Sequence, residues 1–225
     1  MTSTGADVRQ LTSSSASYSA PAWFPDGKHI LYLSIQEGHS RFFSIDSESR
    51  QQQLVADLPE RVDRFAVSPD GTQIAFAVWN IWVHDLVTRK NRQLTFDPEV
   101  LAYPQWSPDG EFISGDQQHG ADTNIMLVPA AGGPVSQLTF DHGNNWSNGW
   151  SHDSDKIIFA KRPAGGFWNV WTVSRSTKAQ QQLTHYTKLN TGIDTPVISP
   201  HGDQLVYEYL ETTGNIWMLD LDQAQ

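Results

Sequence analysis

The chain of 225 residues is 38% hydrophobic and 11% aromatic, which is enough for one substantial folded domain and disfavours a disordered chain. Its 25 acidic and 15 basic residues give a formal net charge of −10, which argues against nucleic acid as a partner because phosphates are bound by basic faces. Cysteine is absent, so disulfides, thiolate catalysis and cysteine-ligated zinc are all excluded.

Residues 1–7 contain neither a basic flank nor an apolar run, so we expect no signal peptide in this chain. No apolar stretch approaches the roughly 20 residues that a membrane-spanning helix needs, and we therefore expect no membrane insertion. These features fit a cytoplasmic protein or a domain of a longer chain, and they leave the compartment open.

Short Gln-Leu-Thr segments recur along the chain, and the first lies near the N-terminus at residues 10–12. Further copies lie at residues 53–55 (as Gln-Leu-Val), 93–95, 137–139 and 182–184. Each segment is brief and follows polar residues, which is typical of a half-exposed strand at the edge of a sheet.

A Pro-Asp-Gly turn is the second recurring element, at residues 25–27, 69–71 and 108–110. It returns in altered form as His-Asp-Ser at 152–154 and Pro-His-Gly at 200–202. Proline presets φ, aspartate accepts a hydrogen bond from the following backbone and glycine takes positive φ, so each copy predicts a chain reversal. The intervals between successive copies are 44, 39, 44 and 48 residues, and a period in the forties indicates a repeat architecture.

Two strands are expected after each turn. An apolar strand is predicted at residues 30–33, 74–77, 157–160 and 205–208, with a weaker copy at 113–115, where Gly115 replaces an aromatic ring. Asn-Ile-Trp or a close variant then begins at Asn80, Asn124, Asn169 and Asn215, and residues 41–46 are the version in the first repeat. The alternation of large and small residues in these segments has the two-residue period of a strand.

Four short strands per repeat of about 40 to 50 residues are typical of one blade of a β-propeller. The sequence therefore predicts an all-β, five-bladed β-propeller of four-stranded antiparallel blades, formed by a single domain over residues 1–225. The predicted blade units are residues 13–56, 57–96, 97–140, 141–185, and 186–220 together with 8–12.

The last unit lacks its outer strand, because the spacing would place a fifth Gln-Leu-Thr at residue 228, beyond Gln225. The extra copy at residues 8–12 supplies a strand for this place. We therefore expect the N-terminal strand to pair with residues 215–220 and to close the ring, because pairing removes exposed sheet edges.

The Ser-Pro-Asp-Gly turn, the Asn-Ile-Trp strand and the Gln-Leu-Thr strand together resemble the PD40 (WD40-like) β-propeller repeat of TolB-like propellers, over residues 8–220. The same repeat occurs in tricorn protease and in bacterial sensor and regulator proteins. Two features depart from the pattern. The fourth and fifth turns are altered, and TolB-like propellers usually have six blades where this sequence holds five repeats.

The loops from each outer strand to the next inner strand gather at one end of a propeller channel, and binding residues are commonly carried by such loops. The recurring aspartates lie at the other end and are interpreted as turn formers. The candidate loops are residues 13–18, 57–64, 97–103, 141–148 and 185–194. The candidate ligand-binding residues on them are Arg61, Arg64, Glu99, Tyr103, Asp141, His142, Asn145, Trp146, His185, Tyr186 and Asp194.

We expect a monomeric, non-enzymatic binding propeller that recognises a protein segment or peptide through this loop-rich face. No Gly-x-Ser-x-Gly elbow, His-Glu-x-x-His motif or phosphate loop occurs, so we assign no catalytic residue. We expect no cofactor and no metal, because adjacent Asp141 and His142 rarely supply a complete metal shell. The resemblance implies a sensor or regulatory module of a larger bacterial protein, and it allows a periplasmic or a cytoplasmic location.

Two alternatives stay open. The chain could be the propeller portion of a hydrolase, either associated with a peptidase or acting as a glycosidase with channel carboxylates such as Asp63, Glu99 and Asp194. It could also be a structural scaffold without a ligand, since a polar loop surface needs no binding partner.

Overall fold

The computed structural model describes residues 9–12, 17–36, 38–58, 60–62, 64–188, 191–198 and 204–211. All of the regular secondary structure in these residues is β. The first two sheets contain β1 (Ser17–Trp23), β2 (His29–Gln36), β3 (His39–Asp46), β4 (Gln52–Leu58), β5 (Phe65–Val67), β6 (Gln73–Val78), β7 (Asn80–Asp85) and β8 (Lys90–Gln93). The others contain β9 (Leu101–Trp106), β10 (Phe112–His119), β11 (Asp122–Pro129), β12 (Ser136–Gln137), β13 (Gly143–Trp150), β14 (Lys156–Pro163), β15 (Asn169–Ser174), β16 (Gln180–Gln182), β17 (Thr191–Ile198) and β18 (Leu205–Glu211).

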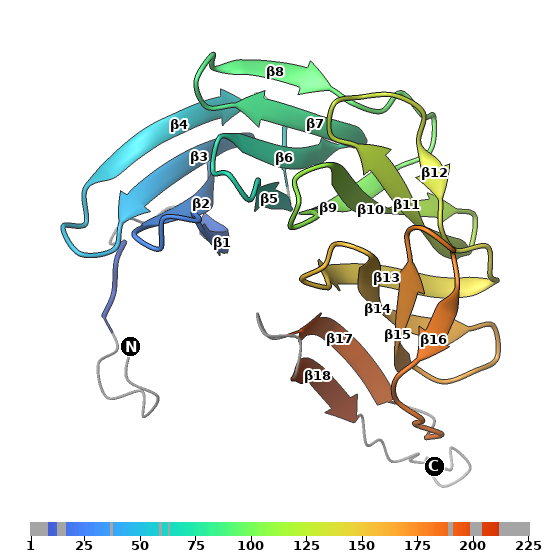
Figure 1. Ribbon diagram of the computed structural model, residues 1–225. Helices are drawn as coiled ribbons and strands as arrows, with labels where there is room; N and C mark the ends of the chain where they lie inside the picture. The colour runs from blue at the N-terminus through green and yellow to red at the C-terminus, as the bar shows by residue number, and fades with distance from the viewer. Residues whose placement is uncertain are drawn as a thin grey trace, which may run out of the picture.

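The strands form four antiparallel sheets of four strands each, and within each sheet the spatial order is the chain order. A fifth sheet contains β17 and β18 in the described residues. Figure 1 shows the sheets side by side along an arc, with β1, β5, β9, β13 and β17 on its inner side and β4, β8, β12 and β16 on its outer side. Repeated meanders of this kind, arranged around a centre, form the blades of a propeller.

The predicted turns join the two inner strands of each sheet. Gly71 and Gly110 each have φ +72°, and each donates its N–H to the carbonyl of the serine three residues earlier, at 2.9 Å. The altered fourth turn keeps the same geometry, because Ser154 takes φ +60° and donates to Ser151 O at 2.9 Å. The fifth predicted turn, at residues 200–202, lies outside the described residues.

In the second, third and fourth sheets the Gln-Leu-Thr segments differ from the prediction, because the outer strand ends at the glutamine, whereas residues 53–55 of the first sheet lie within β4 as expected. Leu94 and Leu138 are buried instead, at 4% and 1% exposure, and therefore anchor the chain in the core. The hydroxyl of Thr95 accepts a hydrogen bond from the N–H of Ile81 at 3.0 Å and donates one to Asn80 Oδ1 at 2.8 Å. In these three sheets the threonine therefore joins the end of the outer strand to the start of the strand beside it.

Hydrophobic clusters fill the spaces between successive sheets, and one of them packs Leu31 and Phe42 of the first sheet against Phe65 and Phe76 of the second. A tryptophan at the end of an inner strand adds a hydrogen bond to the preceding sheet. Trp106 Nε1 donates to Ala66 O and Trp150 Nε1 donates to Gln105 O, both at 3.2 Å.

The predicted closure of the ring is not seen in the described residues, which form an open arc without a closed sheet (Figure 1). Arg9 to Thr12 form no strand, and the guanidinium of Arg9 donates instead to Ser47 O. Their predicted partner strand, residues 215–220, lies outside the described residues, so no ladder partner for residues 8–12 is described. Trp23 ends β1 as Trp106 ends β9, but it is 58% exposed at the end of the arc.

Candidate functional site

Three of the inner strands share an irregularity near the channel. β1, β9 and β17 each contain a register shift, with a positive φ at Ala20 (50°), Tyr103 (55°) and Thr195 (45°). The next residue is proline in all three strands, and proline is tolerated in sheets at bulges because it has no N–H for the ladder. A bulge redirects the side chains beside it, and the backbone strain of such residues clusters at functional sites.

Side chains next to the bulges of β9 and β17 line part of a hollow of about 670 Å³ at the inner side of the arc. Arg64, Tyr103, Trp146 and Asp194 are among its lining residues, and each comes from a different sheet or from the loop before it. The structure therefore brings together four residues that the sequence analysis selected from four separate loops. A volume of this size lies in the range of small-molecule and peptide sites.

Aromatic rings at the hollow are held by their neighbours. The guanidinium of Arg64 lies 5.8 Å from the ring centre of Tyr103, which is 48% exposed. The ring of Trp146 lies 4.4 Å from that of the buried Trp168, and Arg162 lies 5.2 Å from the other ring of this pair. Ring faces that are fixed in place and still exposed offer contact area at a small entropic cost.

The other candidates do not line this hollow. Arg61 lines a smaller neighbouring hollow of about 300 Å³, together with Arg64 and Tyr103. Asn145 is buried and donates to Thr123 O at 2.7 Å. Asp141 accepts hydrogen bonds from Lys161 Nζ at 2.7 Å and from Gln180 Nε2 at 2.8 Å, so its carboxylate is engaged in holding its own sheet.

Two candidates on the rim form carboxylate–histidine pairs. Glu99 contacts the ring of His119, and His142 Nδ1 lies 2.8 Å from Asp122 Oδ2. The hydrogen bond and the charge of Asp122 raise the pKa of His142. Both histidine side chains are well exposed, and solvent screening makes such pairs weak.

His185 and Tyr186 lie apart from the channel hollow, beside a separate hollow of about 310 Å³ on the fourth sheet. The hydroxyls of Tyr186 and Tyr207 are 2.6 Å apart, and this hydrogen bond raises the pKa of Tyr207. Asp63, named above as a possible channel carboxylate, lies outside the described residues.

The sequence analysis missed Asp116, which lines the channel hollow and is 5% exposed. A signal was present, because Asp116 occupies the place of Ala77 and Ala160 in the equivalent strands. The neighbouring Gly115 made the strand look weak, but β10 is a full eight-residue strand. A Cβ on Gly115 would lie 3.0 Å from Ala102 O, so glycine permits the close approach of β9.

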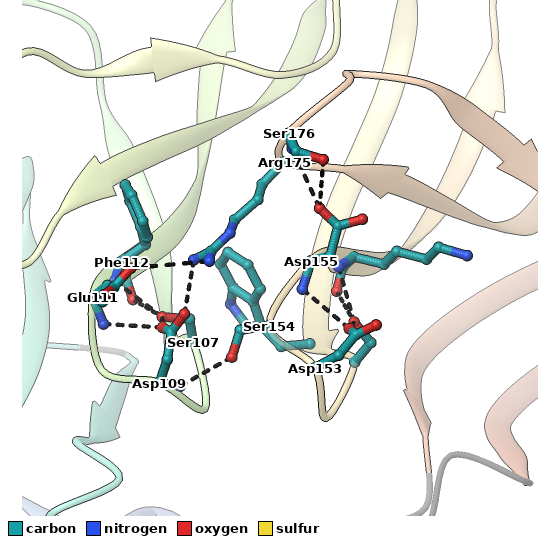
Figure 2. Close-up of polar contacts among 12 residues, drawn as sticks. Ser107, Asp109, Glu111, Phe112, Asp153, Ser154, Asp155, Arg175 and Ser176 are labelled. Carbon is teal, nitrogen blue, oxygen red and sulfur yellow. Dashed lines mark hydrogen bonds and ion pairs between the residues drawn. The ribbon is translucent and has the colours of Figure 1, made fainter.

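The opposite end of the sheets carries the Pro-Asp-Gly turns, and its polar groups are engaged with one another (Figure 2). Arg175 forms an ion pair with Asp109 at 2.9 Å and lies 4.8 Å from the ring centre of Phe112, while Asp109 N donates to Ser154 Oγ at 3.0 Å. Burial raises the pKa of Asp109, but the hydrogen bond from Ser107 and the charge of Arg175 help to lower it overall. These contacts join the third and fourth sheets, so the aspartates of these turns have a structural role.

Among the described residues, no group of three or more His, Asp or Glu side chains is arranged to hold a metal ion. The same part of the chain has no helix with the length and apolarity to cross a bilayer.

Comparisons with known proteins show which proteins share this fold. The Tol-Pal system protein TolB of Anaeromyxobacter dehalogenans (strain 2CP-C) is 30% identical over 109 residues, 45% of this chain and 24% of that protein. Uncharacterized peptidase YuxL of Bacillus subtilis (strain 168) is 24% identical over 142 residues, 62% of this chain and 21% of that protein. The crystal structure of TolB from Acinetobacter baumannii matches with a TM-score of 0.74 at 25% identity, over 90% of this chain and 51% of that chain.

The chain thus spans about a quarter or less of the length of these two curated relatives, and about half of the solved TolB chain. The model of the PD40 family, described as the TolB beta propeller domain, matches residues 1–223. The chain therefore belongs to the PD40 family of TolB-type β-propeller domains.

Proposed function

We propose that the chain is a non-enzymatic binding propeller that recognises a protein segment or peptide at the mouth of its channel. The observation that carries this proposal is the hollow of about 670 Å³ lined by side chains from three sheets and from the loop before β5. It combines exposed aromatic rings with a few polar groups on a rigid scaffold, which is the composition of a recognition site. The TolB relative, whose name assigns it to the Tol-Pal system, supports a protein partner.

The proposal includes a role within a longer bacterial protein, as a sensor or regulatory module. The short span of the chain within its relatives supports this arrangement. A second candidate is the propeller portion of a hydrolase, which the peptidase relative favours. Asp116 and Asp194 line the same hollow and are the carboxylates that a glycosidase of this fold would use.

Peptide selection on the purified chain tests the binding proposal. A random twelve-residue phage-displayed library is panned on the wild-type protein, and the selected peptides are titrated against Trp146→Ala. We expect the Kd of these peptides to rise at least about tenfold, because exposed aromatic anchors dominate recognition sites. Trp23→Ala is the matched control, since it removes a similarly exposed indole next to the Pro-Asp-Gly turns.

Equal binding to wild-type, Trp146→Ala and Trp23→Ala would place the peptide elsewhere, and failure to select any peptide would refute peptide recognition. The hydrolase alternative is tested separately with panels of chromogenic aminoacyl and glycoside substrates. Hydrolysis that is lost in Asp116→Asn and Asp194→Asn would replace the binding proposal with an enzymatic one.

We also propose that the ring closes when residues 8–12 pair with residues 215–220, giving five blades. Gln10 Nε2 donates to Thr12 O at 2.7 Å, and the same bond at the same length joins Gln93 to Thr95, Gln137 to Thr139 and Gln182 to Thr184. The N-terminal copy thus has the local conformation that places a threonine hydroxyl against an asparagine in the second, third and fourth sheets. By this equivalence, Thr12 would contact Asn215.

Cysteine cross-linking tests the closure without background, because the chain has no cysteine. The pair Thr12→Cys with Asn215→Cys should form an intramolecular disulfide under mild oxidation, as should the control pair Thr95→Cys with Asn80→Cys. Cross-linking of the control alone would refute closure. A disulfide-linked dimer of the first pair would show that the sheet is completed by a second copy.

A further inference from the structure

A second hollow, of about 300 Å³, lies between the second and third sheets and is lined by two arginines in a protein of net charge −10. We call it the arginine pocket and define it by Arg61, Arg64, Trp79 and Tyr103, with apolar residues of β6 and β9 between them. It adjoins the channel hollow, because Arg64 and Tyr103 line both. A peptide at the channel mouth can therefore extend into it.

The charge of Arg64 is available to a ligand. Arg41 and Arg175 pair with Asp57 and Asp109, whereas in the described part of the chain Arg64 forms no ion pair and lies over the ring of Tyr103. The planar guanidinium presents several N–H donors in a geometry that matches a carboxylate. Stacking on Tyr103 leaves its edge able to donate these hydrogen bonds.

The walls of the pocket are held in place before any ligand arrives. Val62, between the two arginines, is fully buried, and its N–H donates to Ser40 Oγ at 2.8 Å. The carbonyl of Trp79 accepts a hydrogen bond from Leu101 N at 2.9 Å, which ties the β6–β7 hairpin to β9. A preformed site loses less conformational entropy on binding.

The aromatic side of the pocket is unusual in its backbone and its exposure. Trp79 has φ +60° and Tyr103 has φ +55°, a region that L residues rarely occupy, and Trp79 is 72% exposed. A large indole held in a strained conformation and left in solvent has no role in the core. Strained residues of this kind occur at ligand sites, where the surrounding structure maintains them.

We propose that the arginine pocket binds a carboxylate of the peptide, with an adjacent apolar side chain packed on Trp79. A cationic edge beside two aromatic rings matches a carboxylate flanked by an apolar group, and the volume admits about one or two residues. The carboxylate can come from an acidic side chain or from a peptide C-terminus. This inference rests on the proposed peptide recognition and adds its chemical preference.

Three short peptides separate these sources by NMR titration of the ¹⁵N-labelled chain, with the Trp79 indole signal assigned through Trp79→Phe. Acetyl-Ser-Phe-Asp-Gly-amide carries a side-chain carboxylate, acetyl-Ser-Phe-Asn-Gly-amide carries none, and acetyl-Ser-Asn-Gly-Phe with a free C-terminus carries a terminal one. We expect at least one acidic peptide to bind about tenfold more tightly than the neutral one, because charged hydrogen bonds are stronger than neutral ones.

Arg64→Gln should remove this preference and bring the Kd ratio to about one, while Arg64→Lys should keep part of it because the charge remains without the planar fork. Lys90→Gln is the matched control, since it removes one positive charge from the exposed end of β8. A preference that survives Arg64→Gln, or is lost equally in Lys90→Gln, overturns the pocket assignment. An unchanged thermal midpoint in Arg64→Gln shows that its effect is not unfolding.

The two proposals fail in different ways. Equal affinity for acidic and neutral peptides, with library-selected peptides still sensitive to Trp146→Ala, overturns the arginine pocket and leaves peptide recognition intact. Absence of binding by every test peptide and every library peptide overturns both.

Discussion

At the Pro-Asp-Gly end of the sheets, polar groups satisfy one another, with Arg175 paired to Asp109 and Asp70 bonded to Ser68 and Thr72. At the channel mouth, Arg64 lies on a ring face, and Tyr103 and Trp146 are exposed. The two ends use similar residue types, but the polar side chains of the third and fourth turns contact one another across two sheets, whereas Tyr103 and Trp146 at the channel mouth present exposed ring faces. The comparison teaches that contacts between sheets mark a structural role for the turns, and that exposed rings gathered at one hollow mark the candidate binding end.

The largest expected difference is between two tryptophans of one strand. Trp150 packs between the third and fourth sheets and donates to Gln105 O, whereas Trp146 faces the channel hollow. Trp150→Ala should lower the free energy of unfolding by about 3 kcal/mol or more, because it leaves a cavity between sheets. Trp146→Ala should lower it less and reduce peptide binding instead. Urea denaturation of both variants measures the difference, and equal losses would show that both indoles are structural.

A smaller difference is expected between two arginines. Arg175→Met should lower the free energy of unfolding by about 1–3 kcal/mol, because Asp109 would lose its partner in a partly buried site. Arg64→Met should change stability by less than about 0.5 kcal/mol, since its main contact is with an exposed ring. Thermal unfolding at fixed pH compares the two, and a larger loss in Arg64→Met would contradict the assignment of the two ends.

The pH dependence of stability should come from the turn aspartates. The hydrogen bonds from His29 hold the pKa of Asp26 at about 2, and those from Ser68 and Thr72 lower that of Asp70, against an ordinary value near 3.8. A carboxyl with a lowered pKa stabilises the fold above its ordinary value, and this contribution is lost as pH falls through the folded value. We expect little change from these groups between pH 7 and about 5, and a decline below about pH 4.

Thermal midpoints measured from pH 7 to 2.5 check this expectation. In Asp70→Asn, the thermal midpoint should fall less steeply as the pH drops below about 4. Retention of the full slope in that variant would assign the acid sensitivity to other carboxyls.

A small net effect on stability is also expected at Trp79. Trp79→Gly relieves the positive φ but adds backbone freedom to the unfolded chain, so the net change should stay within about 1 kcal/mol. The same variant removes the aromatic wall of the arginine pocket and should weaken binding of the acidic peptides. Circular dichroism and the NMR titration measure these two results, and a strong loss of stability would mean that the exposed indole supports the fold.

Sequence patterns predicted the repeat, the all-β class and the position of each turn that the structure describes. They also selected Arg64, Tyr103, Trp146 and Asp194 as candidates. They could not separate Trp146 from its neighbours Asp141 and Asn145, whose side chains are held by Lys161 and by the carbonyl of Thr123. They missed Asp116, because it lies within a strand that neighbouring Gly115 made look weak.

The sequence by itself determined the elements whose causes lie within a few residues: the Pro-Asp-Gly reversals and the two-residue alternation of the strands. Only the tertiary structure decided which side chains meet at the channel and which form hydrogen bonds with neighbouring residues instead. The physical reason is that the bulges at Tyr103 and Thr195 redirect side chains at the channel, and the residues that these side chains meet come from other sheets, as Arg64 does for Tyr103.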